Sequence, residues 1–337
     1  MPSLFRTLLA LVALSLVVAG ALTLTFTLPA TLFPEAVQAP APAPDFPPSI
    51  VAWVLDPAEP VFTGAGGDAW DRKIRERGWI MIEDGTYHLW YTGYNDDRSP
   101  LRLLGHATSP DGLHWTRDPA NPLVTDSWVE DMCVVKRDGT YYMFAEGKDD
   151  IAHLLTSTDR IHWTEHGPLD IRRTSGEPIS PGPRGTPTVW VEGDTWYLFY
   201  ERSDQGVWLA TSKDRKVWTN VSDDPVLAMG PEPYDRYAVA VDQVLKRDGY
   251  YYAYYHANAH KPWKDWTTCV ARSRDLIHWE KYPGNPIIDH NWSSGILVEG
   301  PRGTWFYTMH PEVRRFRPQG GSGRGEESFL PLAPPGR

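Results

Sequence analysis

The sequence is poor in cysteine and in positive charge, and each shortage excludes a class of protein. Its 337 residues include 2 cysteines, too few for a disulfide-built scaffold or for a four-cysteine zinc site. Lys and Arg number 33 against 43 Asp and Glu, so the formal net charge is −10. Because such a chain lacks a basic face to neutralise phosphates, we expect no nucleic-acid partner.

Long apolar runs are also scarce, and the one that exists lies at the N-terminus. Arg6 is the only charged residue before Glu35, and residues 7–33 are strongly apolar. This pattern is typical of a cleaved secretory signal or of an uncleaved membrane anchor, and both alternatives stay open. Either one predicts an extracytoplasmic protein that is secreted, periplasmic or attached to the membrane through residues 7–33.

Composition separates the ends of the chain from its middle. Residues 1–33 are assigned to the signal or anchor, and residues 34–49 form a proline-rich linker. Residues 316–337 are rich in Gly, Pro and Arg, and we expect a disordered tail there. The remaining residues, 50–315, contain most of the 16 Trp, 16 Tyr and 10 Phe of the chain, an excess that suits a β-rich core.

This middle region repeats one unit five times. Aromatic and β-branched segments flank a glycine-containing turn in each unit, a strong hairpin signal. The residues that open the second segment are Thr86, Thr140, Thr195, Tyr250 and Thr304. Their spacings are 54, 55, 55 and 54 residues, so the hairpins are copies of one unit.

A second motif follows the hairpin in four of the five units. It reads Ser-x-Asp-x-x-x-Trp and starts at Ser109, Ser157, Ser212 and Ser273. The Asp can accept backbone N–H bonds in a turn, and the Trp can then pack between units. We interpret this motif as architecture and not as a ligand site.

Five such units around an axis predict an all-β fold, a five-bladed β-propeller of about 54 residues per blade. The fifth unit ends early, and residues 50–55 can supply its missing outer strand and so close the ring. We expect a monomer. Cys133 and Cys269 fall in units two and four, which do not touch, so buried thiols are expected instead of a disulfide.

The repeat also predicts which side chains meet at one mouth of the propeller. The start of each innermost strand and the end of the next strand share one face. Six residues after the residues that open the second segment of each unit stand Thr92, Glu146, Glu201, His256 and His310. At the starts of the first two inner strands stand Glu76, Arg77, Glu130 and Asp131. Trp128 and Trp292 precede equivalent places in units two and five.

Carboxylates, imidazoles and tryptophans at one mouth indicate a carbohydrate site. Sugar hydroxyls bind carboxylates, and the C–H faces of the ring stack on aromatic side chains. Crowded carboxylates repel one another, so their pKa values move apart. One carboxyl can then act as the acid and another as the base, as glycoside hydrolysis requires. Strand alternation predicts that at most one of Glu130 and Asp131 faces the axis.

The five-unit period, the Ser-x-Asp turns and Asp131 resemble the five-bladed propeller glycoside hydrolases of the family-43, 32, 117 and 130 type. Family-43 members place a base Asp, a pKa-tuning Asp and an acid Glu at the inner-strand starts of the first three blades. Here only the second place is matched, by Asp131. Glu76 and Arg77 stand at the first place, with Asp71 upstream, and Gly185 and Thr186 stand at the third.

The resemblance implies a glycoside hydrolase that acts on a poly- or oligosaccharide and inverts the anomeric centre, and the apolar N-terminal segment adds the expectation that it is exported. The candidate catalytic residues are Asp71 as base with Glu76 as the alternative base, Asp131 as base or pKa tuner, and Glu201 as general acid. The candidate substrate-binding residues are Glu76, Arg77, Trp128, Glu130, Glu146, Glu177, His256, Trp292 and His310. No cofactor is expected to be required. The resemblance places His310 near an axial Ca²⁺ ion or water, and we expect no protein metal-ligand set.

Two other functions remain open from the sequence. A glycoside phosphorylase of the same fold would need a basic phosphate pocket beside the acids. A non-catalytic carbohydrate-binding propeller would explain the incomplete family-43 triad.

Overall fold

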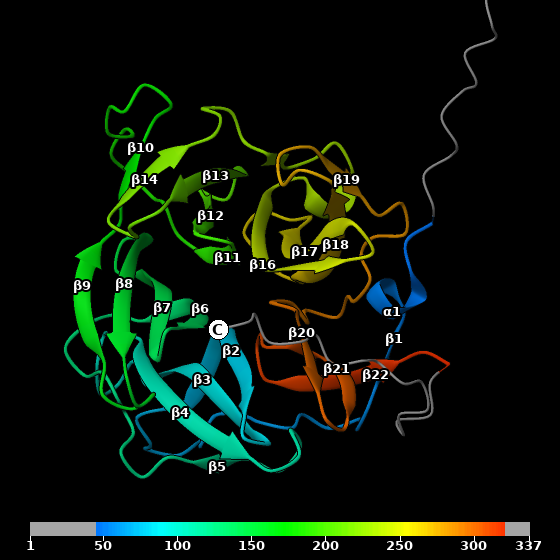
Figure 1. The fold of residues 1–337 in the computed structure, drawn as a ribbon. Helices are drawn as coiled ribbons and strands as arrows, with labels where there is room; N and C mark the ends of the chain where they lie inside the picture. The colour runs from blue at the N-terminus through cyan, green and yellow to red at the C-terminus, as the bar shows by residue number, and fades with distance from the viewer. Residues whose placement is uncertain (1–44, 321–337) are drawn as a thin grey trace, which may run out of the picture. The chain divides into compact units, whose positions relative to one another are not determined.

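The computed structural model describes residues 45–320 and folds them into five sheets around one axis (Figure 1). The arrangement confirms the predicted five-bladed β-propeller. Residues 1–33, most of the linker 34–49 and most of the tail 316–337 lie outside the described residues. Within the described part, no helix combines the length and apolar character needed to cross a membrane.

Each blade is a sheet, and in blades one, two and four the strands follow one another outward from the axis in chain order. Blade one contains β2 (Lys73–Glu83), β3 (Thr86–Tyr94), β4 (Leu103–Ser109) and β5 (Thr116–Arg117). Blade two contains β6 (Glu130–Arg137), β7 (Thr140–Gly147), β8 (Ile151–Ser157) and β9 (Thr164–Pro168).

Blade three is the widest sheet. It contains β11 (Thr188–Glu192), β12 (Thr195–Glu201), β13 (Gly206–Ser212), β14 (Val217–Asn220), β10 (Asp170–Arg172) and β15 (Leu227–Ala228). Blade four contains β16 (Ala238–Arg247), β17 (Tyr250–Asn258), β18 (Thr267–Ser273) and β19 (Trp279–Lys281). The short helix η1 (Pro233–Asp235) precedes β16.

Blade five closes the ring with strands from both ends of the described chain. It contains β20 (Ile296–Gly300), β21 (Gly303–Thr308), β22 (Arg314–Pro318) and β1 (Trp53–Leu55). β1 pairs antiparallel with β22, Trp53 opposite Pro318, which confirms that residues 50–55 supply the missing outer strand. The pairing covers an edge that would otherwise be exposed.

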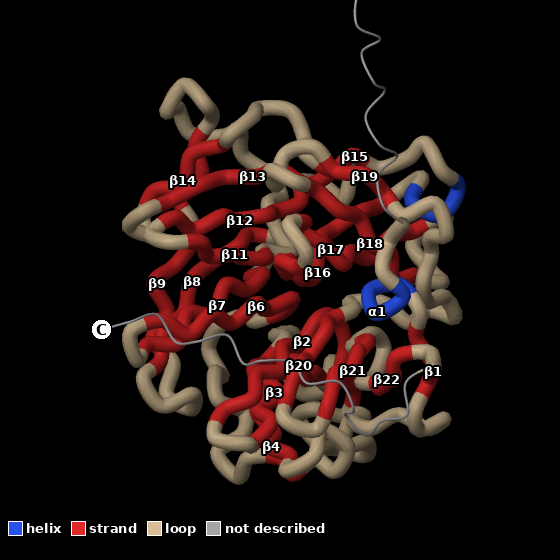
Figure 2. Tube along the Cα trace, turned by 45° about the vertical axis from the view of Figure 1, so that its right-hand side comes forward, coloured by secondary structure: helices blue, strands red, loops and turns tan. Residues whose placement is uncertain are grey.

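The propeller extends beyond its expected limits on both sides. The helix α1 (Pro48–Val51) packs beside blades four and five (Figure 2). Phe46, expected in the linker, is buried against Tyr252 and Tyr282, and Phe316, expected in the tail, is buried in β22. Both aromatic rings bury apolar surface, which composition averaged over a Pro- or Gly-rich segment does not reveal.

The two repeated motifs build the turns and the packing between blades. Thr86, Thr140, Thr195 and Tyr250 open the second strands of blades one to four, and Thr304 is the second residue of β21. In the turn after β4, Oδ1 of Asp111 accepts the backbone N–H groups of Leu113 and His114, both at 2.9 Å. The Asp therefore caps backbone N–H groups in the turn, as predicted. Cys133 and Cys269 are buried free thiols, also as predicted.

Candidate active site

The candidate site begins with irregular backbone at the inner-strand starts. Register shifts interrupt the inner ladders between Arg75 and Trp79, Glu130 and Cys133, and Val241 and Gln243. Positive φ angles occur at Glu76 (58°), Asp131 (45°), Thr186 (44°) and Ser294 (60°). Residues other than glycine adopt this conformation at a cost, and such residues gather at functional sites. These four residues lie at the mouth that the repeat predicted, and we call this end of the axis the hub.

Glu130 and Asp131 both reach the hub. The bulge in β6 and the positive φ of Asp131 break the alternation of the strand. Glu130 accepts a hydrogen bond from Nε1 of Trp128 at 2.7 Å, and Asp131 accepts the backbone N–H of Arg77 at 2.9 Å. The prediction that at most one of the two carboxylates faces the axis is therefore wrong.

Arg77 holds the inner strands together at the centre of the hub. Its side chain is fully buried. The guanidinium donates to the carbonyl oxygens of Met132 at 3.1 Å, Pro187 at 2.7 Å and Val241 at 2.8 Å. These carbonyls belong to three different blades, so Arg77 serves the scaffold and not the substrate-binding role that the sequence suggested. An axial Ca²⁺ ion or water stays a prediction. Within residues 45–320, no three His, Cys, Asp or Glu side chains are grouped as metal ligands.

Glu146 and Glu201 face each other across Gly185. Oε2 of Glu146 accepts the backbone N–H of Thr186 at 2.8 Å, and Oε1 of Glu201 accepts that of Gly185 at 3.1 Å. A Cβ atom on Gly185 would lie 2.1 Å from the first carboxylate and 3.0 Å from the second. Glycine at this position therefore lets the two carboxyl groups approach.

Burial and mutual repulsion raise the pKa of most hub acids. Burial and the charge of Glu76 raise the pKa of Asp131 to about 6 and that of Glu130 to about 8. Burial and the charge of Asp204 raise the pKa of Glu201 to about 7, and burial followed by the charge of Asp131 raises that of Glu146 well above its usual range. Several hub carboxyls can therefore carry a proton near neutral pH.

Glu76 is the exception among these acids. Burial alone would raise its pKa, but His310 and the guanidinium of Arg75 lower it to about 2. Oε2 of Glu76 lies 3.5 Å from Nδ1 of His310, and Oε1 forms an ion pair with Arg75. The side chains of Glu76 and His310 are 19% and 17% exposed, so this pair forms the wetter part of the hub.

His256 supplies a buried positive charge. Burial alone would lower its pKa, but the carboxylate of Asp242 raises it to about 9. Nδ1 of His256 lies 2.7 Å from Oδ1 of Asp242, whose other oxygen accepts the backbone N–H of Gly295 at 3.2 Å. The charges of Asp131 and Glu76 also favour the protonated imidazole.

Three candidates from the sequence lie apart from this cluster. Asp71 accepts hydrogen bonds from Tyr91 at 3.0 Å and from Arg117 at 2.7 Å, so its carboxylate stabilises blade one. Glu177 is exposed in the turn that follows β10. The ring of Trp292 is covered by the guanidinium of Arg314 at 4.4 Å, which leaves that face unavailable for stacking. All three residues lie close in sequence to segments at the mouth, but the sequence does not show which side chains they contact.

Sequence reasoning missed Asp204. Its backbone N–H donates to Oε2 of Glu201 at 2.5 Å. Burial raises the pKa of its carboxyl, with His256 acting in the opposite direction. Asp204 stands three residues after Glu201 in the loop that leaves the mouth, and this proximity was the available signal.

Comparison with known proteins agrees with the fold. No protein-family model matches the chain. A 1,2-β-oligomannan phosphorylase from Thermoanaerobacter sp. (strain X514) is 24% identical over 257 residues, which cover 66% of this chain and 82% of that protein. A solved structure from Bacteroides thetaiotaomicron, described as a proposed glycosidase, has a TM-score of 0.65 and 16% identity over 81% of this chain and 98% of its own.

A second solved structure comes from work on glycoside hydrolase family 130. That family is described as mannoside phosphorylases that include hydrolases of β-1,2-mannosidic linkages in Candida mannan. This solved structure has a TM-score of 0.62 and 14% identity to the chain, and the match covers 84% of this chain and 98% of that structure. These likenesses confirm the resemblance to glycoside hydrolase propellers at the level of the fold.

Proposed function

We propose that this chain is a glycoside hydrolase in which Asp131 is the general acid and Glu76 is the general base. The observation that carries the proposal is the difference in pKa between two neighbouring carboxyl groups. The pKa of Glu76 is about 2 and that of Asp131 is about 6. Two interacting acids whose environments push their pKa values apart are suited to the two roles of glycoside cleavage.

The proposed reaction uses one water molecule. Protonated Asp131 gives its proton to the glycosidic oxygen as the bond from that oxygen to the anomeric carbon breaks. Ionised Glu76 takes a proton from water, and the water oxygen bonds to the anomeric carbon. Attack from the opposite face inverts the anomeric centre, as the family resemblance implies.

Glu201 is the weaker candidate for the general acid, although the sequence favoured it. Both of its carboxylate oxygens accept backbone N–H bonds, from Gly185 and Asp204. Asp131 has one oxygen committed to the Arg77 backbone, which leaves the other for a substrate.

The substrate class that we propose is a β-linked mannoside. Both the relative from Thermoanaerobacter and the family-130 structure carry names that include β-1,2-mannosides. The test is a panel of β-1,2-linked mannooligosaccharides, arabinosides and galactosides, incubated with the full chain in phosphate-free buffer. Release of free mannose is expected. Tight binding without release would support a non-catalytic carbohydrate-binding propeller instead.

Phosphorolysis is the second candidate, favoured by the name of the relative from Thermoanaerobacter. A phosphate dianion needs cations that are not already neutralised. Arg75 lies against Glu76 and Glu130, His256 against Asp242, and Arg77 against backbone carbonyls. Because these three cations are committed, water is the acceptor that we propose; Arg184 and Arg202, next to Gly185 and Glu201 in the chain, are the cations to test for phosphate binding. Release that requires phosphate and yields mannose 1-phosphate would establish the phosphorylase instead.

An extracytoplasmic location belongs to the same proposal. Its support is the apolar segment of residues 7–33. Fractionation of the source cells with an antibody to the propeller would test it, and recovery in the cytoplasm would contradict it.

A further inference from the structure

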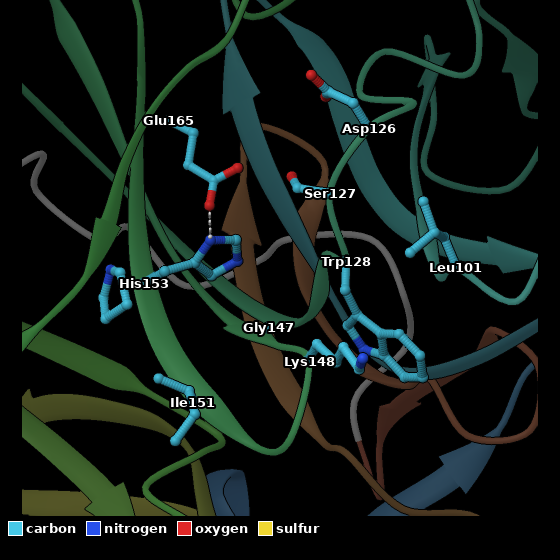
Figure 3. A pocket seen from close by; sticks show the side chains of 10 residues that line it. Leu101, Asp126, Ser127, Trp128, Gly147, Lys148, Ile151, His153 and Glu165 are labelled. Carbon is cyan, nitrogen blue, oxygen red and sulfur yellow. Dashed lines mark hydrogen bonds and ion pairs between the residues drawn. The ribbon is translucent and has the colours of Figure 1, made fainter.

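A cavity of about 250 Å³ opens on blade two, apart from the catalytic carboxyls of the hub. Its wall combines Trp128, Gly147 and Lys148 with His153 of β8 and Glu165 of β9 (Figure 3). The volume lies below the roughly 300–1,000 Å³ of sites for drug-sized ligands. The cavity is therefore suited to a ligand of about one sugar ring.

His153 presents an unpartnered nitrogen at this cavity. The residue is 4% exposed, and its Nδ1 lies 2.9 Å from Oε1 of Glu165. Nε2 is buried and has no hydrogen-bond partner among the described residues. In Figure 3 this nitrogen lies on the side of the ring that faces Trp128. Because Nδ1 faces the carboxylate, Nε2 is the ring nitrogen left to form a hydrogen bond with a ligand hydroxyl, which can both donate and accept.

The charge around the cavity favours a neutral ligand. Asp126 and Glu165 stand against one cation, Lys148, so an anion would meet net repulsion. The indole of Trp128 and the side chains of Leu101 and Ile151 supply apolar surface. A wall of apolar groups with a few oriented polar atoms is the arrangement that binds a sugar ring.

Trp128 connects the cavity with the hub. Its indole lines the cavity while its Nε1 donates to Oε2 of Glu130 at 2.7 Å. Gly147, which also lines the cavity, directly follows Glu146 of the hub. A glycan that reaches from the hub past Trp128 would therefore enter this cavity with its next sugar units.

We propose that the cavity beside His153 is an accessory subsite that binds one hexose unit of the substrate through Nε2 of His153 and the indole of Trp128. The identity of that hexose rests on the proposed function. A neutral sugar hydroxyl forms a hydrogen bond with Nε2, and the apolar face of the sugar ring lies on the face of the Trp128 indole that is left open by the guanidinium of Arg102, which lies over the other face at 5.0 Å.

Two variants test the subsite without touching the hub carboxyls. Gly147→Ala would place a Cβ atom 3.6 Å from Nε2 of His153 and 3.1 Å from the carbonyl oxygen of Ile151, which narrows the cavity. His153→Phe keeps a ring but removes both nitrogens. The matched control is His166→Phe, because His166 is an exposed histidine on the same blade that bonds Thr156.

The first experiment compares kcat/KM on a β-1,2-mannotetraose and on a short aryl β-mannoside. Both test variants are expected to lose about tenfold on the tetraose and to match the wild type on the aryl glycoside, with His166→Phe unchanged on both. Melting temperatures show whether each variant folds. Equal losses on both substrates, or no loss in a folded variant, would overturn the subsite while leaving the proposed hydrolase intact.

The second experiment is independent of turnover. Mannose is titrated into the wild type and the three variants by calorimetry, and inorganic phosphate is titrated in parallel. A sugar affinity about tenfold weaker in His153→Phe and Gly147→Ala supports the subsite even if no glycan is cleaved. Unchanged mannose binding, or phosphate binding that depends on His153, would overturn it.

Discussion

At the scale of single residues, the hub depends on conformations that a side chain resists. Glu76 and Asp131 hold φ angles of 58° and 45°, and each turns a carboxylate toward the axis that a regular strand would have directed elsewhere. Such strain costs of order 1–3 kcal/mol per residue, so the surrounding structure must impose it. Arg77 contributes to this constraint, since its backbone N–H and its guanidinium both bond Asp131.

The pH dependence of activity follows from two of these residues. The general acid must be protonated and the base ionised, so kcat/KM should fall as pH rises above about 6, where Asp131 loses its proton. On the acid side, activity should persist down to a pH near 2 or to the onset of unfolding, because Glu76 stays ionised. A pH profile on an aryl mannoside and a mannobiose measures both limbs.

Arg75→Gln provides the check on that assignment. Removing this guanidinium should raise the pKa of Glu76 and move the acid limb toward neutral pH. If the loss of activity at low pH occurred at the same pH in Arg75→Gln as in the wild type, another residue would act as the base.

Arg77 makes a separate prediction about stability. Arg77→Met removes the guanidinium that donates to the buried carbonyls of Asp131, Met132 and Pro187. Each unsatisfied buried polar group costs about 1–3 kcal/mol, so the free energy of unfolding should fall by at least about 3 kcal/mol. Urea denaturation measures the loss. Arg173→Met, at an exposed turn, should change it by less than about 0.5 kcal/mol, and equal effects would refute the axial role.

At the scale of elements, the repeat made most of the strands predictable. Fixed spacing places a hairpin and a turn in each unit, and the polar residues at the second-strand ends follow by counting. The bulges could not be counted, because one inserted residue reverses every side chain beyond it. The bulge in β6 therefore brought Glu130 to the hub against expectation. Asp71 pairs instead with Arg117 of β5, a contact that the repeat could not predict.

The Ser-x-Asp turn allows a test at the same scale. In blade four, Oδ1 of Asp275 accepts the backbone N–H groups of Ile277 and His278 at 2.9 and 2.8 Å. Asp275→Ala removes both bonds and should lower stability by about 1–2 kcal/mol with unchanged kcat/KM. Thermal unfolding and a rate assay measure the two effects. A folded Asp275→Ala protein without activity would show that the motif serves catalysis.

At the scale of the whole molecule, closure of the ring brings distant acids together. Three blades supply the hub acids Glu76, Asp131, Glu146 and Glu201. The pairing of β1 with β22 closes the ring that brings these blades together. The ring could be predicted from the period alone. The contents of the hub could be predicted only in part, because loop conformation and local strain decide which carboxyls meet.

Truncation to a chain that starts at Asp56 tests the closure. It removes α1 and β1, exposes the edge of β22 and uncovers the aromatic cluster around Phe306 and Phe316. We expect a fall in melting temperature and concentration-dependent association through the open edge, measured by calorimetry and light scattering. A monomer with unchanged melting temperature would show that blade five closes without β1.

The most direct test of the central claim compares leaving groups. Protonation by Asp131 matters for a mannobiose, whose leaving alcohol is poor, and matters little for a dinitrophenyl mannoside, whose leaving group needs no proton. We expect Asp131→Asn to lose at least about 100-fold in kcat on the mannobiose and less than about tenfold on the dinitrophenyl glycoside, and Glu76→Gln to lose comparably on both. Equal losses for Asp131→Asn on the two substrates, or this selective pattern in Glu201→Gln, would contradict it.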